Sequence, residues 1–87
     1  MHETGLVRDL IRRVAQAAAA NDARRVVGVQ VWLGALSHLS AAHFQEHFEA
    51  ESRGTLAEGA QLTVTESTDP ADPRAQSLLL ESLELEV

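Results

Sequence analysis

The sequence predicts an α/β fold, a two-layer sandwich of two helices on one face of a three-stranded mixed sheet. Apolar residues recur first at helical spacing, then in alternation, then at helical spacing again, and finally in two further alternating segments. The chain of 87 residues has the size of one small domain with a modest core. It contains one Trp, two Phe and no Tyr, so Val, Leu, Ile and Ala must build most of that core. We expect a single domain over residues 1–87.

Residues 4–21 are predicted to form the first helix. Apolar side chains repeat every three or four positions, whereas Arg and Asp occupy the opposite side. The apolar positions are Leu6, Val7, Leu10, Ile11, Val14, Ala17 and Ala18. Thr4 suits the N-cap position, where a hydroxyl accepts a hydrogen bond from the first helical turn. Packing of this helix should hold residues 1–3 near one end of the domain.

Residues 26–33 alternate instead, and their many Val residues favour a strand. One face would carry Val27, Val29, Val31 and Leu33, and the other Val26, Gly28, Gln30 and Trp32. A large aromatic side chain on the second face of a sheet needs cover. Either the long neighbouring side chains cover part of Trp32, or it contacts a binding partner.

A second helix is predicted over residues 40–52. Ser40 is its expected N-cap, and Leu39 and Phe44 have the spacing of a hydrophobic staple. Phe44 and Phe48, four residues apart, are the expected buried anchors. Gly54 follows the last turn, where a left-handed glycine ends many helices.

Two further strands are predicted over residues 60–66 and 77–87, separated by a polar loop that contains both prolines. The first two strands are joined through a helix and should run parallel, whereas the loop 67–76 should join the last two as an antiparallel hairpin. Leu78 and Leu80 do not fit the alternation of the last strand. Either a bulge near Glu81 turns them inward, or they lie beside Trp32 on an exposed, partner-binding face.

The composition excludes several classes of function. The formal net charge is −6 and the Arg residues form no stripe, so nucleic acid and anionic membranes are disfavoured as partners. No apolar segment is long enough to span a membrane, and we expect a cytoplasmic protein. The absence of cysteine excludes disulfides and thiolate zinc sites. No spacing of Ser, His and Asp suggests a catalytic triad, so we do not expect an enzyme.

Met1-His2-Glu3 is the first candidate metal site. A free α-amine, the amide nitrogens of His2 and Glu3, and the His2 imidazole can converge on one ion. Four nitrogens in a plane suit Ni(II) or Cu(II) better than Zn(II). The amine and the imidazole ordinarily have pKa values of about 7.8 and 6.5, so binding would depend on pH near neutrality. Judged from these three residues alone, an N-terminal His is more often solvated and without a metal role.

His43 and His47, four residues apart on the second predicted helix, are a second and weaker candidate metal site. Both imidazoles could reach one ion from the same helix face. A pair without a third ligand is incomplete, so we favour the alternative that both are hydrogen-bonded residues beside the buried aromatic stripe. His38 is expected to be exposed. Glu58 is expected either to cap its own turn or to contribute to a metal site.

Several short segments carry a resemblance through their order and spacing. They are Met1-His2-Glu3, Ala23-Arg24-Arg25-Val26, Leu33-Gly34-Ala35-Leu36-Ser37, Arg53-Gly54-Thr55-Leu56-Ala57-Glu58-Gly59-Ala60 and Leu80–Val87. Together they resemble the HypA/HybF family, the nickel metallochaperones of NiFe-hydrogenase maturation. The resemblance runs almost without gaps over residues 1–66, and residues 80–87 resemble the last strand of the family's nickel-binding domain.

The resemblance implies a nickel metallochaperone whose ligands are the amino-terminal region, His2 and Glu3. It also implies two partners, the large hydrogenase subunit and the maturation GTPase HypB. The family inserts a zinc-binding domain with two Cys-x-x-Cys pairs between its last two strands, and here residues 67–76 stand in that place. Since this chain has no cysteine, we expect nickel and no zinc.

An alternative function belongs to a different class. The chain could be a non-catalytic structural or accessory subunit that keeps the fold and binds a hydrogenase-related protein without delivering metal. Trp32, Leu78 and Leu80 would then form a protein interface. The sequence leaves open whether copies of the chain form a homo-oligomer.

Overall fold

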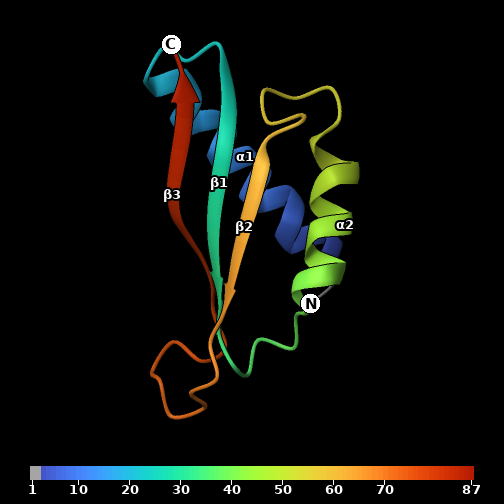
Figure 1. Ribbon diagram of the computed structural model, residues 1–87, viewed down its shortest axis with the longest axis vertical. Helices are drawn as coiled ribbons and strands as arrows, with labels where there is room; N and C mark the ends of the chain where they lie inside the picture. The colour runs from blue at the N-terminus through green and yellow to red at the C-terminus, as the bar shows by residue number, and fades with distance from the viewer. Residues whose placement is uncertain (1–2) are drawn as a thin grey trace.

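The computed structural model describes the backbone of residues 3–87 and the side chains from Gly5 onward. Its elements follow the order α1 (Glu3–Ala20), β1 (Arg25–Leu33), α2 (Ala41–Ser52), β2 (Gln61–Glu66) and β3 (Leu78–Glu86). The three strands form one mixed sheet, and both helices lie against the same face of it (Figure 1). The predicted two-layer α/β fold is therefore confirmed.

The sheet has the order β2-β1-β3. β1 and β2 run parallel, as the helical connection between them predicts, and β1 and β3 run antiparallel. The expected hairpin of the last two strands is wrong, because β3 pairs with β1 and not with β2. β1 is the most apolar strand, and a central position pairs the backbone along both of its edges. The segment 67–77 is long enough to cross the end of β1 and reach its far side (Figure 1).

A bulge in β1 shifts its alternation. Val26 pairs with Leu85 and Gly28 with Glu84, so Val27 is an extra residue without a partner on β3. Val26 is consequently buried in the core and Val27 is half-buried. The predicted faces of these two valines are therefore wrong.

A second bulge lies in β3 and decides between the two alternatives for Leu78 and Leu80. Gln30 pairs with Ser82 and Val31 with Leu80, which leaves Glu81 as the extra residue. Because residues opposite each other on paired strands share a face, Leu80 lies with Val31 on the helix-covered side. Leu78 and Leu80 both pack against the core. They do not lie beside Trp32 on the open face.

The core fills the space between the sheet and the two helices. Its side chains come from α1, β1 and α2, and partly buried residues of β2 and β3 close its edges. The largest fully buried side chains are Phe44, Phe48, Leu10, Leu33, Val7, Val14, Val26, Val29 and Val31. Aliphatic residues thus provide most of the core, with the two Phe of α2 as its aromatic anchors.

The ends of the helices follow from local chemistry. Ser40 is the N-cap of α2, and its hydroxyl accepts a hydrogen bond from the backbone N–H of His43 at 3.1 Å. Gly54 has φ +79°, the left-handed conformation predicted for it. The Glu58 carboxylate accepts a hydrogen bond from the Gly54 N–H at 2.7 Å, so it stabilises its own turn. α1 begins at Glu3, so Thr4 lies inside the first turn and is not the N-cap.

Candidate metal centre

The first candidate site falls largely outside the described residues. Met1 and His2 lie beyond them, and of Glu3 only the backbone is described. That backbone is the first residue of α1. The N–H groups of the first turn of a helix have no acceptor within the helix, so the amide nitrogen of Glu3 is not committed to the helical hydrogen-bond ladder.

The remainder of α1 is firmly placed. Val7, Leu10 and Val14 are completely buried, which fixes one side of the helix on the core. Arg8 Nε lies 2.9 Å from Glu51 Oε2, and this pair joins the second turn of α1 to the last turn of α2. The hydrogen bond that Arg8 donates to Glu51, and then the negative charge of Glu51, raise the pKa of Arg8. α1 is therefore held firmly against the core and against α2 from its second turn onward.

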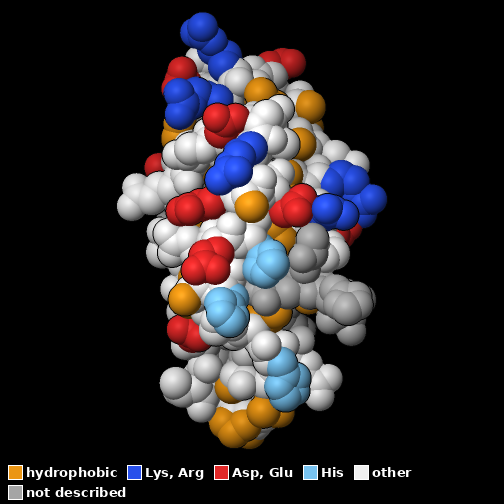
Figure 2. Space-filling model, turned by 90° about the vertical axis from the view of Figure 1, so that its right-hand side faces the viewer, with side chains coloured by type: hydrophobic (Ala, Val, Ile, Leu, Met, Phe, Trp, Pro, Cys, Tyr) orange, Lys and Arg blue, Asp and Glu red, His pale blue; other side chains and the backbone are white. Residues whose placement is uncertain are grey.

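The second candidate site lies on α2. His43 is exposed and His47 is half-buried, each next to one of the two buried Phe residues in the chain. Histidine side chains gather on one face of the molecule (Figure 2). His38 is exposed, as predicted, in the loop before α2. Among the described side chains, no three His, Asp or Glu residues converge on a point where they could hold a metal ion.

Trp32 lies on the open face of the sheet and is half-buried. The Arg74 guanidinium carbon lies 5.0 Å from the centre of the Trp32 ring, close enough for a cation–π contact. Leu79, paired with Trp32 on β3, shares that face. The cover that the sequence requires for Trp32 thus comes from the segment 67–77. The contact of Arg74 with Trp32 could not be predicted from sequence patterns. An arginine in a polar loop, far from Trp32 in the chain, does not by itself indicate such a contact.

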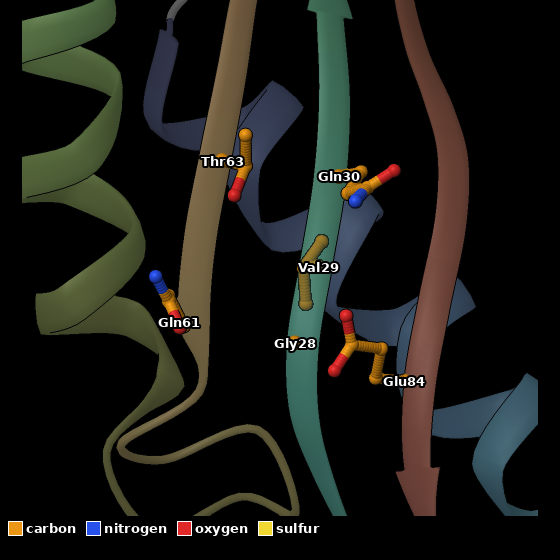
Figure 3. A pocket seen from close by; sticks show the side chains of 6 residues that line it. All are labelled: Gly28, Val29, Gln30, Gln61, Thr63 and Glu84. Carbon is orange, nitrogen blue, oxygen red and sulfur yellow. The ribbon is translucent and has the colours of Figure 1, made fainter.

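A shallow hollow of about 130 Å³ lies on the same open face (Figure 3). Its lining residues are Gly28, Val29, Gln30, Gln61, Thr63 and Glu84. Glu84 lies directly over Gly28, where a Cβ atom would meet the Glu84 side chain at 3.2 Å. The hollow offers amides, a hydroxyl and a single carboxylate, a set suited to hydrogen bonding and not to holding a metal ion.

Comparison with known proteins identifies relatives of the chain. A family model described as HypA, "Hydrogenase/urease nickel incorporation, metallochaperone", matches residues 1–72. The hydrogenase maturation factor HypA of Klebsiella pneumoniae is 41% identical over 66 residues, which are 76% of this chain and 58% of that protein. The HypA of Archaeoglobus fulgidus is 36% identical over 74 residues, which are 85% of this chain and 66% of that protein. The chain thus spans less than two thirds of the length of either relative.

The fold also has counterparts among solved structures. The solution structure of the nickel metallochaperone HypA from Helicobacter pylori matches with a TM-score of 0.84 at 21% identity, covering 99% of this chain and 98% of that one. A second solution structure of a HypA protein matches with a TM-score of 0.76. Both likenesses concern the fold.

Neither described helix is long and apolar enough to cross a membrane.

Proposed function

The chain belongs to the HypA family, and from this premise we propose that it is a nickel metallochaperone of hydrogenase maturation. Its cargo is Ni(II), held by Met1, His2 and Glu3. The ligands are the α-amine, the amide nitrogens of His2 and Glu3, and the His2 imidazole. This planar set of four nitrogens suits a d⁸ ion.

The observation that supports this proposal most is the start of α1 at Glu3. An amide must lose its proton to bind nickel through nitrogen, and an amide in the helical ladder would have to give up a hydrogen bond first. The Glu3 amide has no such bond within α1, because it belongs to the first turn. The helix beginning supplies a nitrogen donor at a fixed place.

Electrostatics also favours this form of the site. The beginning of a helix carries about half a positive charge, which opposes a bare cation and favours an anion. Two deprotonated amides neutralise the two charges of Ni(II), so the complete chelate has no net charge from these groups. The helix therefore does not repel the chelate, although it would repel a hydrated nickel ion bound at the same place.

Delivery would proceed by ligand exchange. A chelate on a terminal segment can be approached by the donors of a recipient protein while part of its own ligand set is still bound. We propose that the recipient is the large hydrogenase subunit or the GTPase HypB. The names of the relatives support a role in hydrogenase maturation, since they are hydrogenase maturation factors.

A second candidate function is an accessory subunit that binds a hydrogenase-related protein without delivering metal. The open face of the sheet favours it, because Trp32 and Leu79 lie there as paired residues of β1 and β3. A stoichiometric complex that persists after removal of nickel would indicate this function. An association that requires nickel would indicate delivery.

Calorimetric titration with Ni(II) tests the metallochaperone function. His2→Ala, and separately a variant whose Met1 α-amine is acetylated, should each abolish the tight site, because each removes a donor from the four-nitrogen set. His38→Ala is the matched control, since it removes an exposed imidazole from another part of the chain and should leave the site intact. Unchanged affinity in the first two variants would exclude the proposed chelate.

A further inference from the structure

We propose that the hollow on the open face of the sheet binds the guanidinium group of an arginine side chain of a partner protein. The row Gln61, Gly28 and Glu84 crosses the sheet from β2 through β1 to β3. Because Gly28 has no side chain, the backbone of β1 forms the floor of the hollow. The Glu84 side chain reaches toward Gly28, so its carboxylate points into the hollow (Figure 3).

The hollow contains a carboxylate without a cation. Glu84 forms no ion pair with any side chain that the structure describes. Of the arginines at this face, Arg25 has its Nε 3.9 Å from Glu86 Oε2. The other, Arg74, has its Nε 3.4 Å from Asp72 Oδ1. Since both are next to other carboxylates, a cation from a partner would complete the charge pairing of the face.

The shape of the hollow favours a guanidinium over an ammonium group. Its volume of about 130 Å³ equals that of about four water molecules at about 30 Å³ each, enough for a planar group of one carbon and three nitrogens. Acceptors on two strands, the Glu84 carboxylate, the Gln61 carbonyl and the Thr63 hydroxyl, suit the fork of N–H donors of arginine. The Gln30 carbonyl oxygen already accepts from the Ser82 hydroxyl at 2.6 Å. An ammonium carries its donors on one nitrogen and would fill less of the hollow.

The surroundings favour an arginine of a protein over a free small molecule. The hollow is shallow and its polar side chains are exposed, so it cannot enclose most of a ligand as small-molecule sites do. The face continues beyond it to Trp32 and Leu79, which are paired and half-buried. Arginine and apolar contacts side by side are typical of protein interfaces. The occupant is therefore a protein segment that presents an arginine and an apolar side chain.

The distance between the two features specifies this segment further. Gly28 and Trp32 are four residues apart on β1 and share the open face, so they are about 13 Å apart at about 3.3 Å per residue. An extended segment that lies along β1 has the same period. Its residues at positions i and i+4 would reach the hollow and the Trp32–Leu79 pair together.

NMR titration of the nickel-free chain with N-acetylarginine amide tests the arginine site. The probe should shift the backbone signal of Gly28 and the side-chain amide signals of Gln61 to saturation. N-acetylcitrulline amide, which has nearly the same shape without the charge, should not shift them, and N-acetyllysine amide should bind more weakly. Binding of either control probe as tight as that of the arginine probe would overturn the assignment to a guanidinium group.

Two matched variants locate the site. Glu84→Gln keeps the shape of the side chain and removes its charge, so it should weaken binding of N-acetylarginine amide by about tenfold or more. Glu81→Gln, which changes an exposed carboxylate of the same strand outside the hollow, should leave binding unchanged. Equal affinity of Glu84→Gln and the unchanged protein would overturn the site.

Two short peptides test whether the occupant is a protein segment. In the first, leucine follows arginine by four positions; in the second it follows by three, which turns it to the opposite side of an extended chain. The first should bind about tenfold more tightly than N-acetylarginine amide and shift the Trp32 indole signal. The second should bind only as tightly as the amide. If the first does too, the protein interface falls. Because no nickel is present, these outcomes do not depend on the proposed chelate.

Discussion

Gly34 shows how one residue can determine the course of a distant segment. It follows β1 directly, and its backbone N–H donates to Ser77 O at 2.9 Å. A Cβ atom at this position would lie 2.1 Å from the carbonyl oxygen of Ala75, far inside contact distance. Since that neighbour is backbone, it cannot rotate away. Only glycine lets the segment 67–77 cross the end of β1 closely enough to begin β3.

Gly34→Ala should therefore lower the free energy of unfolding by about 1–3 kcal/mol, the usual effect of forcing an extra carbon into a packed contact. Chemical denaturation of both proteins measures it. Gly5→Ala is the matched control, because nothing lies within 4 Å of the added carbon and alanine favours the helix. Equal stability of Gly34→Ala and the unchanged protein would contradict the close crossing.

Residue roles that depend on nearby sequence could be predicted. The cap at Ser40, the buried pair Phe44 and Phe48, and the left-handed Gly54 all follow from spacing within one helix. The faces of Val26 and Val27 could not be predicted in the same way. They depend on a bulge whose position is set by the partner strand β3, which lies more than fifty residues away.

The segment 67–77 is an ordered element, held by hydrogen bonds to the end of β1. The Asp72 carboxylate accepts from the Arg74 N–H at 2.7 Å and is also within reach of the Arg74 side chain, which covers Trp32. The backbone hydrogen bond from Arg74, followed by the contacts with its side chain, lowers the pKa of Asp72 below its ordinary value of 3.8. Because the folded pKa is lowered, the stabilising effect is complete above pH 3.8 and is lost as the pH falls through the folded value.

The fluorescence of Trp32, the one tryptophan in the chain, reports on this arrangement. Asp72→Ala should shift its emission to longer wavelength at neutral pH, because Arg74 is released and the ring meets more water. In the unchanged protein the same shift should appear only below about pH 4. Asp69→Ala, which removes a carboxylate that bonds to Ala71 in the same segment, is the control and should leave the emission unchanged. A neutral-pH spectrum unaffected by Asp72→Ala would show that Asp72 does not position Arg74.

At the scale of elements, periodicity predicted all five segments to within two residues and the parallel pairing of β1 with β2. It did not predict the partner of β3. A loop of this length can join β2 and β3 as a hairpin, or it can cross the end of β1 and place β3 on the far side of β1. The partner of β3 therefore depends on which strand best tolerates the central position in the sheet. The fully buried Val29 and Val31 make β1 that strand.

At the scale of the whole molecule, the sheet has two unlike faces. The helices and the core cover one face, and the other carries Trp32, Leu79 and the polar hollow. Of the proposed nickel ligands, Glu3 is the first residue of α1, so its backbone belongs to the helical layer. A partner on the open face of the sheet would therefore leave the beginning of α1 uncovered.

The candidate nickel site could be proposed from sequence because it is local. Its donors are consecutive residues, and their chemistry requires no knowledge of the fold. What the structure adds is the helix that begins at Glu3. The cover of Trp32 by Arg74 could not be foreseen, since it joins residues 42 positions apart through a loop with no regular pattern.

The central claim is that nickel binds to deprotonated backbone amides at the beginning of the chain. The most direct test is the number of protons released per bound Ni(II) at the tight site, measured by calorimetry in buffers of different ionisation enthalpy. At about pH 9 the ordinary α-amine and imidazole have already lost their protons, so the two amides should release about two protons per ion. Release of fewer than about one proton per ion under these conditions would mean that the amides keep their hydrogens, and would contradict the proposed chelate.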